Sequence, residues 1–276
     1  MSFDSARFKR EERAGYHLIA ARYAEGSALR AGLNAALMAA AELCGGQRVL
    51  DVASGPGVLA REAAASVGDG LVVASDIAER ALREGLLRAL AEDVRHVVFA
   101  AADAEQLCFA DATFERVLCG LGLMFFPDVP RALAEMRRVL RPGGLAVFSV
   151  WGAAPRTPLV SCALDCLRRV LPPPKVERLS PFRFGDAGLL QQTLAAAGFA
   201  GVAVQPHRFA CTFASAAAYW QAFRDLAGGA AAGLARLPAE TLARLGEEVA
   251  VELAPWRRGE GYRPESEVLI AVARRV

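Results

Sequence analysis

Between residues 48 and 150, short apolar runs alternate in a regular order with longer amphipathic stretches. The apolar runs are rich in β-branched residues, which is typical of buried strands, and they cover residues 48–53, 71–76, 94–100, 114–120 and 145–150. The amphipathic stretches have helical periodicity and cover residues 58–66, 78–92 and 129–140. Strands that alternate with helices at this spacing predict a parallel sheet with helices on both faces.

The flanking segments are less regular and mostly helical. Residues 4–43 predict one or two helices ahead of the first strand. After Trp151 we expect an insertion over 154–181, a helix at 186–197, a strand at 202–213, broken helices at 216–251 and a last strand at 267–276. The predicted fold class is therefore α/β, a Rossmann-like three-layer sandwich with a helical lid and cap insertions.

Composition narrows the class of protein without defining its chemistry. The 276 residues, with 54% hydrophobic and 22% charged side chains, suit one large globular domain or a domain with a cap. The net charge of +2 and the lack of a cluster of basic residues give no support for nucleic-acid binding. Six scattered cysteines without a C-x-x-C pair predict neither a zinc site nor a disulfide framework. Met1–Arg13 has no secretory pattern, and charged residues interrupt the Ala-rich run at 28–44, so we expect a cytoplasmic protein without a membrane span.

The candidate site begins where the first predicted strand turns into a helix. Asp51 stands near the end of the strand, and Ser54, Gly55 and Gly57 break the chain before the helix resumes. Such a turn places backbone N–H groups and a helix N-terminus beside a concave site, and its glycines permit positive φ angles and a close approach by a ligand. The pattern predicts a site for a nucleotide-like cofactor.

The position of Asp51 distinguishes between two cofactor classes. Gly55-x-Gly57-x-x-Ala60 formally matches the dinucleotide fingerprint, but Asp51 lies four residues before Gly55. A carboxylate at this position would repel a pyrophosphate and attract a cation. S-adenosylmethionine carries a sulfonium and an amino group and no phosphate, so the electrostatics favour it.

Further polar residues fall at or near the ends of other predicted strands. Asp76 lies 19 residues after Gly57, a spacing that suits a carboxylate bound to ribose hydroxyls, and Asp103 and Cys119 fall near the next two strand ends. Right-handed crossovers bring the carboxyl ends of parallel strands to one rim of the sheet. These residues are therefore expected to converge on the cofactor.

Several ordered motifs resemble those of the class I S-adenosylmethionine-dependent methyltransferases. The residues that carry the resemblance are the turn at 48–57, Val72–Ile77, Ala102–Leu107, Phe114–Gly120 and the Arg141-Pro142-Gly143-Gly144 turn. The resemblance implies a seven-stranded, mostly parallel sheet with an antiparallel last strand. It also implies S-adenosyl-L-methionine as the cofactor and transfer of its methyl group to an acceptor.

The same resemblance implies roles for individual residues. The methionine end of the cofactor is expected beside Asp51, Ala53, Ser54, Gly55 and Gly57. The remaining cofactor contacts implied are Asp76 to the ribose, Ile77, Asp103 and Ala104 to the adenine, and Cys119 and Leu121 along the fourth strand. No metal site is expected.

The N-terminal helices are expected to lie across the cofactor as a lid, as they commonly do in this family. Tyr16 and Tyr23 share a helical face and would cover the methionine part of the cofactor, although they could equally pack onto the sheet. His17 is the best-placed candidate for a catalytic base, with His207 or a carboxylate in the caps as alternatives. A lone histidine on an amphipathic helix can also be purely structural.

The stretch after the fourth strand should border the transferred methyl group. Gly122-Leu123-Met124-Phe125-Phe126-Pro127 is similar to a stretch in ubiquinone and menaquinone biosynthesis methyltransferases. Met124, Phe125, Phe126 and Trp151 are expected to line a pocket for a small, largely apolar acceptor. Aromatic, quinol-like and secondary-metabolite acceptors, methylated on an O, C or N atom, stay open. The alternative is that the two phenylalanines only anchor the loop to the core.

We expect residues 1–47 to form the lid, 48–153 the cofactor-binding core, and 154–276 the caps and the completion of the sheet. Three other functions stay open from the sequence: a cofactor-binding protein that catalyses a step such as cyclisation, an NAD-dependent oxidoreductase, and a methyltransferase acting on RNA or protein. Asp51 disfavours the oxidoreductase, and the absence of a basic patch disfavours RNA. The expected partner is a small-molecule acceptor, and a homodimer is compatible with the helical caps.

Overall fold

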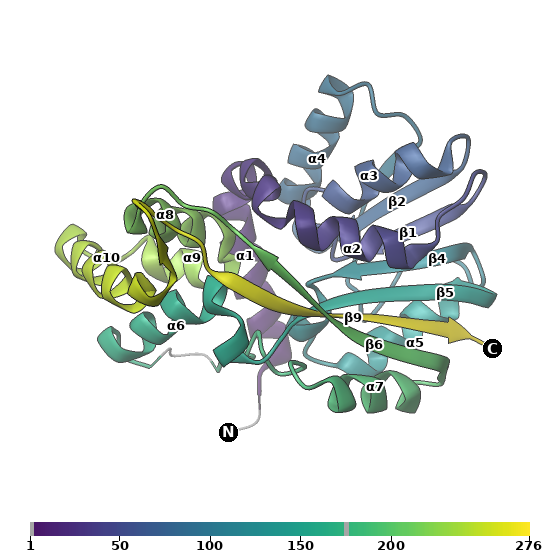
Figure 1. Cartoon of the computed structure of the whole chain (residues 1–276). Coiled ribbons are helices and arrows are strands. Elements are labelled where there is room, and N and C mark those ends of the chain that lie inside the picture. The colour runs from purple at the N-terminus through teal and green to yellow at the C-terminus, as the bar shows by residue number, and fades with distance from the viewer. Residues whose placement is uncertain (1–2, 174–176) are drawn as a thin grey trace.

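A seven-stranded sheet forms the centre of the computed structural model, which describes residues 3–173 and 177–276 (Figure 1). Its strands are β1 (Arg48–Val52), β2 (Leu71–Asp76), β3 (Val97–Ala101), β4 (Phe114–Gly120), β5 (Leu140–Trp151), β6 (Phe199–Ala210) and β9 (Glu265–Arg275). The order across the sheet is β3-β2-β1-β4-β5-β9-β6, and β9 runs antiparallel to both neighbours. The predicted α/β class and the antiparallel last strand are confirmed.

Helices cover both faces of the sheet (Figure 1). One face carries α2 (Ala31–Ala41), α3 (Val58–Val67) and α4 (Glu79–Ala91), and the other carries α5 (Val129–Val139) and α7 (Ala187–Ala196). The helix starts follow the expected capping chemistry, because Asp128 and Asp186 accept hydrogen bonds from backbone N–H groups in the first turns of α5 and α7. Gly198, with φ of 84°, ends α7 in the left-handed conformation.

A second group of helices lies beyond the carboxyl ends of the parallel strands (Figure 1). It contains α1 (Ser5–Glu25), α6 (Pro158–Val170), α8 (Ala216–Leu226), α9 (Gly228–Leu234) and α10 (Ala239–Leu253). Helix α1 packs against both α4 and α9, so it joins the sheet to the cap. The α1–α9 contact is very close: a Cβ atom placed on Gly15 would lie 2.0 Å from the carbonyl oxygen of Gly228. Only glycine at position 15 permits this approach of the two backbones.

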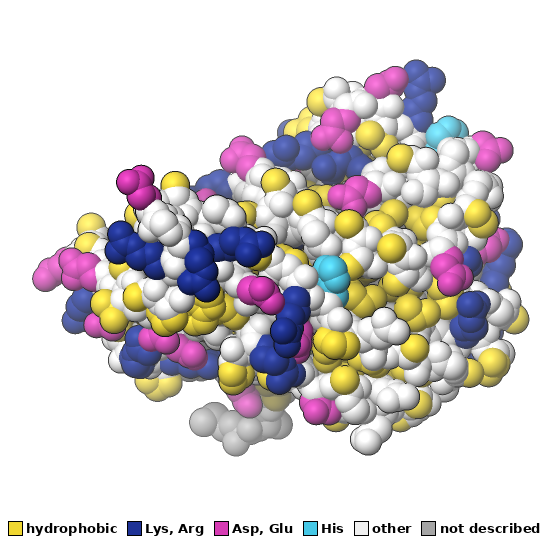
Figure 2. Space-filling view, viewed as in Figure 1, with side chains coloured by type: hydrophobic (Ala, Val, Ile, Leu, Met, Phe, Trp, Pro, Cys, Tyr) yellow, Lys and Arg dark blue, Asp and Glu magenta, His cyan; other side chains and the backbone are white. Residues whose placement is uncertain are grey.

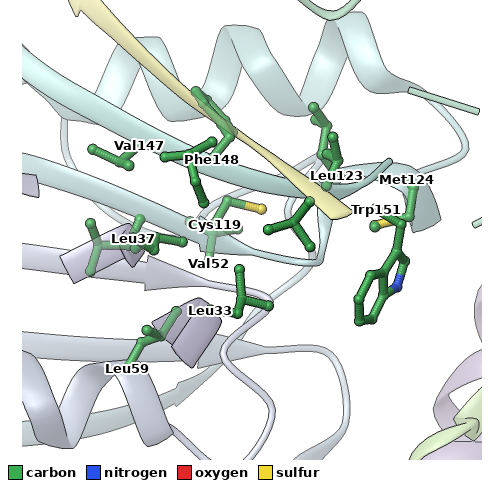
Figure 3. Packing of buried hydrophobic residues seen from close by; sticks show 14 of the residues in the cluster. Leu33, Leu37, Val52, Leu59, Cys119, Leu123, Met124, Val147, Phe148 and Trp151 are labelled. Atoms are coloured by element: carbon green, nitrogen blue, oxygen red, sulfur yellow. The ribbon is translucent and has the colours of Figure 1, made fainter. Parts of the chain in front are cut away.

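The hydrophobic core lies between the sheet and the helices on its faces. Figure 3 shows Leu37 of α2 and Leu59 of α3 beside the strands, with Val52 of β1 and Phe148 of β5 among the other buried side chains of the cluster. Several strand residues are completely buried, as a parallel sheet covered on both faces requires. On the face shown in Figure 2, basic and acidic side chains are interspersed.

The structure shifts several predicted boundaries. Strand β3 begins at Val97 rather than residue 94, because His96 (φ 64°) and Asp93 (φ 49°) form a turn before it. Strand β5 starts earlier, at Leu140, and β6 covers Phe199–Ala210 instead of 202–213. The short hairpin formed by β7 (Arg257–Arg258) and β8 (Gly261–Tyr262) was not predicted. Residues 174–176 of the predicted insertion lie outside the described part of the chain.

In the described part of the chain, no helix combines the length and the apolar character that crossing a membrane requires. The division into lid, core and cap segments stays a prediction.

The packing of two helical glycines leads to opposite predictions for alanine. A Cβ atom on Gly85 of α4 would lie 2.5 Å from the carbonyl oxygen of Pro56 and 2.6 Å from the ring of Phe99, whereas one on Gly233 of α9 meets nothing within 4 Å. Gly85→Ala should lower the free energy of unfolding by about 1–3 kcal/mol through overpacking. Gly233→Ala should raise it by up to about 1 kcal/mol through helix propensity.

Urea unfolding of both variants and the wild type measures these changes. Equal stability of the two variants would contradict the close packing of α4 on the glycine turn.

Candidate active site

A small cavity lies at the carboxyl ends of β1, β2 and β4, and α1 closes it from outside. Its volume is about 100 Å³. The residues predicted from sequence that line it are Tyr16, Tyr23, Ala53, Gly55, Asp76, Ile77, Asp103, Ala104, Leu121, Phe125 and Phe126. Ligand pockets usually measure about 300–1,000 Å³, so we expect α1 to move outward when a cofactor enters.

The glycine turn after β1 is fixed by hydrogen bonds to the end of β2. The Gly55 N–H donates to Oδ2 of Asp76 at 2.7 Å, and the Ser54 N–H donates to the carbonyl of Ser75 at 3.0 Å. The other Asp76 oxygen accepts from the N–H of Ala78 at 2.8 Å. Each carboxylate oxygen keeps a further lone pair for a ligand hydroxyl. Asp76 therefore both shapes the turn and presents acceptors to the cavity.

Two strand ends carry strained backbone where they meet the cavity. Ala53 after β1 has φ of 54°, and Leu121 after β4 has φ of 55°. Non-glycine residues in this region cost of order 1–3 kcal/mol, and such strain concentrates at functional sites. A Cβ atom on Gly55, whose φ is also positive, would lie 3.3 Å from the ring of Tyr23, so the turn and the lid are in contact.

The carboxylate of Asp51 is buried behind the glycine turn and is itself absent from the cavity wall. Its side chain is fully buried, and neither oxygen has a hydrogen-bond partner among the described residues. Burial, followed by the nearby charge of Asp76, raises the pKa of Asp51 well above its ordinary value. Burial likewise raises the pKa of Asp76. Burial without a cation therefore favours the protonated form of these carboxyls. A cationic ligand would stabilise their charged form, whereas a pyrophosphate would oppose it.

Helix α1 contributes a cation to the cavity wall near the end of β3. Lys9 of α1 donates to Asp103 at 2.7 Å and to Glu105 at 2.5 Å. Burial alone would lower the pKa of Lys9, but its hydrogen bonds to the two carboxylates raise it. This ion-pair cluster fastens the start of α1 to the chain that follows β3.

Two tyrosines of α1 form the middle of the lid. The rings of Tyr16 and Tyr23 meet edge to face, with centroids 5.4 Å apart. The guanidinium of Arg30 lies 4.2 Å from the centre of the Tyr23 ring and donates to its hydroxyl. Tyr16 is half-buried and packs against Gly228 of α9, and this burial raises the pKa of its phenol. Both tyrosines line the cavity, and their role as a lid over a cofactor stays a prediction.

The loop after β4 supplies the apolar wall. Phe125 and Phe126 line the cavity, as does Pro127. Arg183 fixes this loop, because its guanidinium donates to the backbone carbonyls of Leu123 and Phe126. Burial lowers the pKa of Arg183 to about 10.

Several residues predicted from sequence lie away from the cavity. Met124 and Trp151 are buried in the hydrophobic core instead of the pocket wall (Figure 3). Cys119 is fully buried, which raises the pKa of its thiol to about 12. His17 points toward α4, where its Nε2 lies 2.9 Å from Oε2 of Glu79. Ser54 and Gly57 shape the turn from behind its lining residues.

Sequence reasoning missed several wall residues, which are Phe8, Lys9 and Glu12 of α1 and Ala81 of α4. The other wall residues lie in predicted motifs (Ala102 and Gly120) or in the stretch expected to border the methyl group (Gly122 and Pro127). A usable signal existed for α1, since Phe8, Glu12 and Tyr16 recur every four residues and so share one helical face. A glutamate between two aromatic residues on one helical face is a sequence feature that could have indicated a site residue.

Comparisons with known proteins agree with this geometry. A family model described as "Methyltransferase domain" matches residues 49–144. A ubiquinone/menaquinone biosynthesis C-methyltransferase of Coxiella burnetii is 40% identical over 116 residues, which cover 41% of this chain and 46% of the Coxiella protein. A demethylmenaquinone methyltransferase of Clavibacter sepedonicus is 34% identical over 169 residues, or 57% of this chain and 67% of that protein.

Solved structures extend the similarity over most of the chain. A Bacillus halodurans protein inferred to be a methyltransferase has a TM-score of 0.62 at 23% identity, covering 88% of this chain and 98% of that one. At this identity the likeness establishes the fold alone.

The fold and the site define an α/β protein with a cavity at the carboxyl ends of its parallel strands. The chain belongs to the class I S-adenosylmethionine-dependent methyltransferases. It spans about half the length of the Coxiella relative that it matches, at 46%.

Replacing Asp51 should stabilise the protein without ligand. Because folding raises the pKa of this carboxyl, the unfolded chain loses the proton first, and stability falls as pH rises above the unfolded pKa of about 3.9. Asp51→Asn should remove this loss and raise the melting temperature at pH 7 by about 2–4 °C for each 1 kcal/mol regained. Melting curves from pH 4 to pH 8 measure the effect.

The matched control is Asp69→Asn, an exposed aspartate just before the start of β2, at the opposite rim. It should leave the melting temperature unchanged. A lower melting temperature for Asp51→Asn at pH 7 would show that the carboxylate stabilises the fold.

Proposed function

We propose that this protein binds S-adenosylmethionine and transfers its methyl group to a ring carbon of a small phenolic acceptor of the 1,4-hydroquinone class. The observation that carries the cofactor is the pair of carboxylates at two neighbouring strand ends, the fully buried Asp51 and the cavity-lining Asp76, for which the described residues provide no ion-pair partner. A sulfonium and an ammonium group would balance this charge. The fit is supported by Ser54, whose hydroxyl is also buried without a partner among the described residues.

The cavity offers a surface for each part of such a cofactor. Asp76 would accept hydrogen bonds from the ribose hydroxyls, since its free lone pairs face the cavity. Ile77 and Ala104 supply apolar contacts for the adenine, and Asp103 an acceptor for its amino group. The methionine end of the cofactor would lie at the turn of Ala53, with Asp51 buried behind it.

Methyl transfer needs alignment and exclusion of water more than it needs a catalytic triad. When bound, S-adenosylmethionine supplies a methyl group on a positively charged sulfur, which an electron-rich carbon can attack. Tyr16 and Tyr23 would cover this region, and Phe125 and Phe126 would hold the acceptor against it. Their rings would exclude water from the reacting atoms.

The acceptor class rests on the wall of the cavity and on the relatives. The aromatic and apolar side chains of the loop after β4 suit a flat ring, and a few polar groups are available to orient it. The relatives are described as a ubiquinone/menaquinone biosynthesis C-methyltransferase and a demethylmenaquinone methyltransferase. Both descriptions concern methylation in quinone chemistry, which agrees with a hydroquinone ring as acceptor.

Calorimetric titration tests the cofactor. The wild type should bind S-adenosylmethionine and S-adenosylhomocysteine, and Asp76→Ala should weaken both by at least about tenfold, because hydrogen bonds to a charged group are lost. Asp69→Ala, at the far rim, should bind like the wild type. Absence of binding by the wild type would refute the cofactor assignment.

Mass spectrometry tests the transfer. With 2-prenyl-1,4-naphthalenediol kept reduced under anaerobic conditions, the product should carry one added methyl group on carbon 3. One S-adenosylhomocysteine should form for each product molecule. Cofactor binding without any methylated product would refute the acceptor class and leave the cofactor assignment standing.

A further inference from the structure

Glu12 is the most deeply buried carboxylate that the lid contributes to the cavity wall. Its side chain sits on the inner face of α1 with the residue only 8% exposed, and it lines the cavity between Phe8 and Tyr16. On the cap side it faces α9, where a Cβ atom on Gly229 would lie 2.8 Å from its Oε1. Glycine at position 229 therefore leaves the space that the carboxylate occupies.

Among the described residues, only one of the two oxygens of Glu12 has a hydrogen-bond partner. Arg178 donates to its Oε1 at 2.6 Å and, through its other terminal nitrogen, to Glu11 at 3.1 Å. The Oε2 atom is buried and has no hydrogen-bond partner in this part of the chain. A buried acceptor without a partner is destabilising, so such an atom at a cavity suits a ligand that donates to it.

The location favours the acceptor over the cofactor as that ligand. Glu12 lies at the junction of α1 with the cap, through Gly229 and Arg178, whereas Asp51 and Asp76 stand at the ends of the strands. The aromatic wall formed by Phe125 borders the same cavity. A hydroxyl on a ring held against that wall could donate a hydrogen bond to the unpartnered Oε2 atom of Glu12.

We propose that Oε2 of Glu12 accepts a hydrogen bond from the hydroxyl of the phenolic acceptor and removes its proton. This inference rests on the proposed function. The residue is therefore both an acceptor-binding group, selecting a ring that carries a hydroxyl, and the general base of the reaction. In the role of general base, Glu12 takes the place that the sequence suggested for His17, whose imidazole is directed to Glu79.

The proton transfer accounts for all atoms and electrons. The hydroxyl O–H bond breaks, its electron pair stays on oxygen, and the proton forms a bond to Oε2 of Glu12. The negative charge spreads to the neighbouring ring carbon and makes it the better nucleophile. After that carbon has gained the methyl group it loses its own proton to solvent, Glu12 returns its proton to the oxygen, and one proton is released overall.

The surroundings of Glu12 suit a base. Burial raises the pKa of Glu12, and Arg178 opposes this rise, while the charge of Glu11 adds to it. Tyr16 lies on the same face, with a phenol whose pKa is raised, and the facing Gly229 of α9 has no titratable group. A carboxylate with a raised pKa accepts a proton more readily than an ordinary one.

Glu11 offers a matched control, because it is the neighbouring glutamate, binds the same arginine and is absent from the cavity wall. The first measurement compares binding of 1-naphthol and 1-methoxynaphthalene to protein saturated with S-adenosylhomocysteine. The wild type and Glu11→Gln should prefer 1-naphthol by about tenfold or more. Glu12→Gln should lose this preference while keeping its affinity for S-adenosylhomocysteine.

The second measurement is the pH dependence of kcat/KM with 2-prenyl-1,4-naphthalenediol. In the wild type the rate should rise as the base loses its proton, and Glu12→Gln should lower kcat/KM at least about a hundredfold and remove this rise. Arg178→Met keeps the base but removes its cation, so the rise should move to higher pH. This shift distinguishes a base from a residue that merely supports the fold.

Distinct outcomes overturn the inference. If Glu12→Gln matches Glu11→Gln in both measurements, or the wild type does not distinguish the two naphthalenes, Glu12 has no role toward the acceptor. If Glu12→Gln weakens S-adenosylhomocysteine itself by tenfold or more, the carboxylate belongs to the cofactor. Failure of the wild type to bind the cofactor would instead refute the proposed function.

Discussion

The hydrogen bond from the N–H of Gly55 to Asp76 is the contact on which the site depends. It joins the turn after β1 to the end of β2, and it holds a carboxylate at the cavity where two parallel strands end. The positive φ angles of Ala53 and Gly55 belong to the same turn. Without this bond, the turn would keep only the backbone bond from Ser54 to Ser75, and Asp76 would no longer be held in place by Gly55.

The carboxylates around the cavity differ in whether the protein pairs them with a cation. Carboxylates that belong to the sheet, Asp51 and Asp76, have no ion-pair partner among the described residues. Glu12, which belongs to the lid, is paired with a cation supplied by the chain itself, Arg178 of the cap. The acidic groups at the strand ends thus lack a cation among the described residues, whereas α1 and the segment at Arg178 are joined by an ion pair.

Much of the fold followed from residue patterns because its signals are local. The turn around Gly55 and the apolar runs of the central strands are specified by neighbouring residues, and their boundaries were nearly correct. The start of β3 was placed at residue 94 although Arg95 and His96 precede its apolar residues, and the positive φ angles of Asp93 and His96 form a turn there. Positive φ at non-glycine residues is not specified by the apolar pattern, so the turn could not be located from it.

The site was predictable where it lies on the sheet and much less so where it lies on the helices. Strand ends converge by topology, so Asp76 could be placed from its spacing alone. The roles of Glu12 and Trp151 depended on how helices and strand ends pack in three dimensions. Trp151 follows an apolar strand and looked exposed to a ligand, yet it stacks on Phe209 in the core.

The backbone contact between Gly15 of α1 and Gly228 of α9 has a consequence for how the cavity can open. Since α1 closes the cavity and is pressed against α9, the two helices cannot separate without exposing apolar surface on both. Under the proposed function, one opening motion of α1 would serve cofactor and acceptor together, and the spent thioether and the methylated product would leave in the same event.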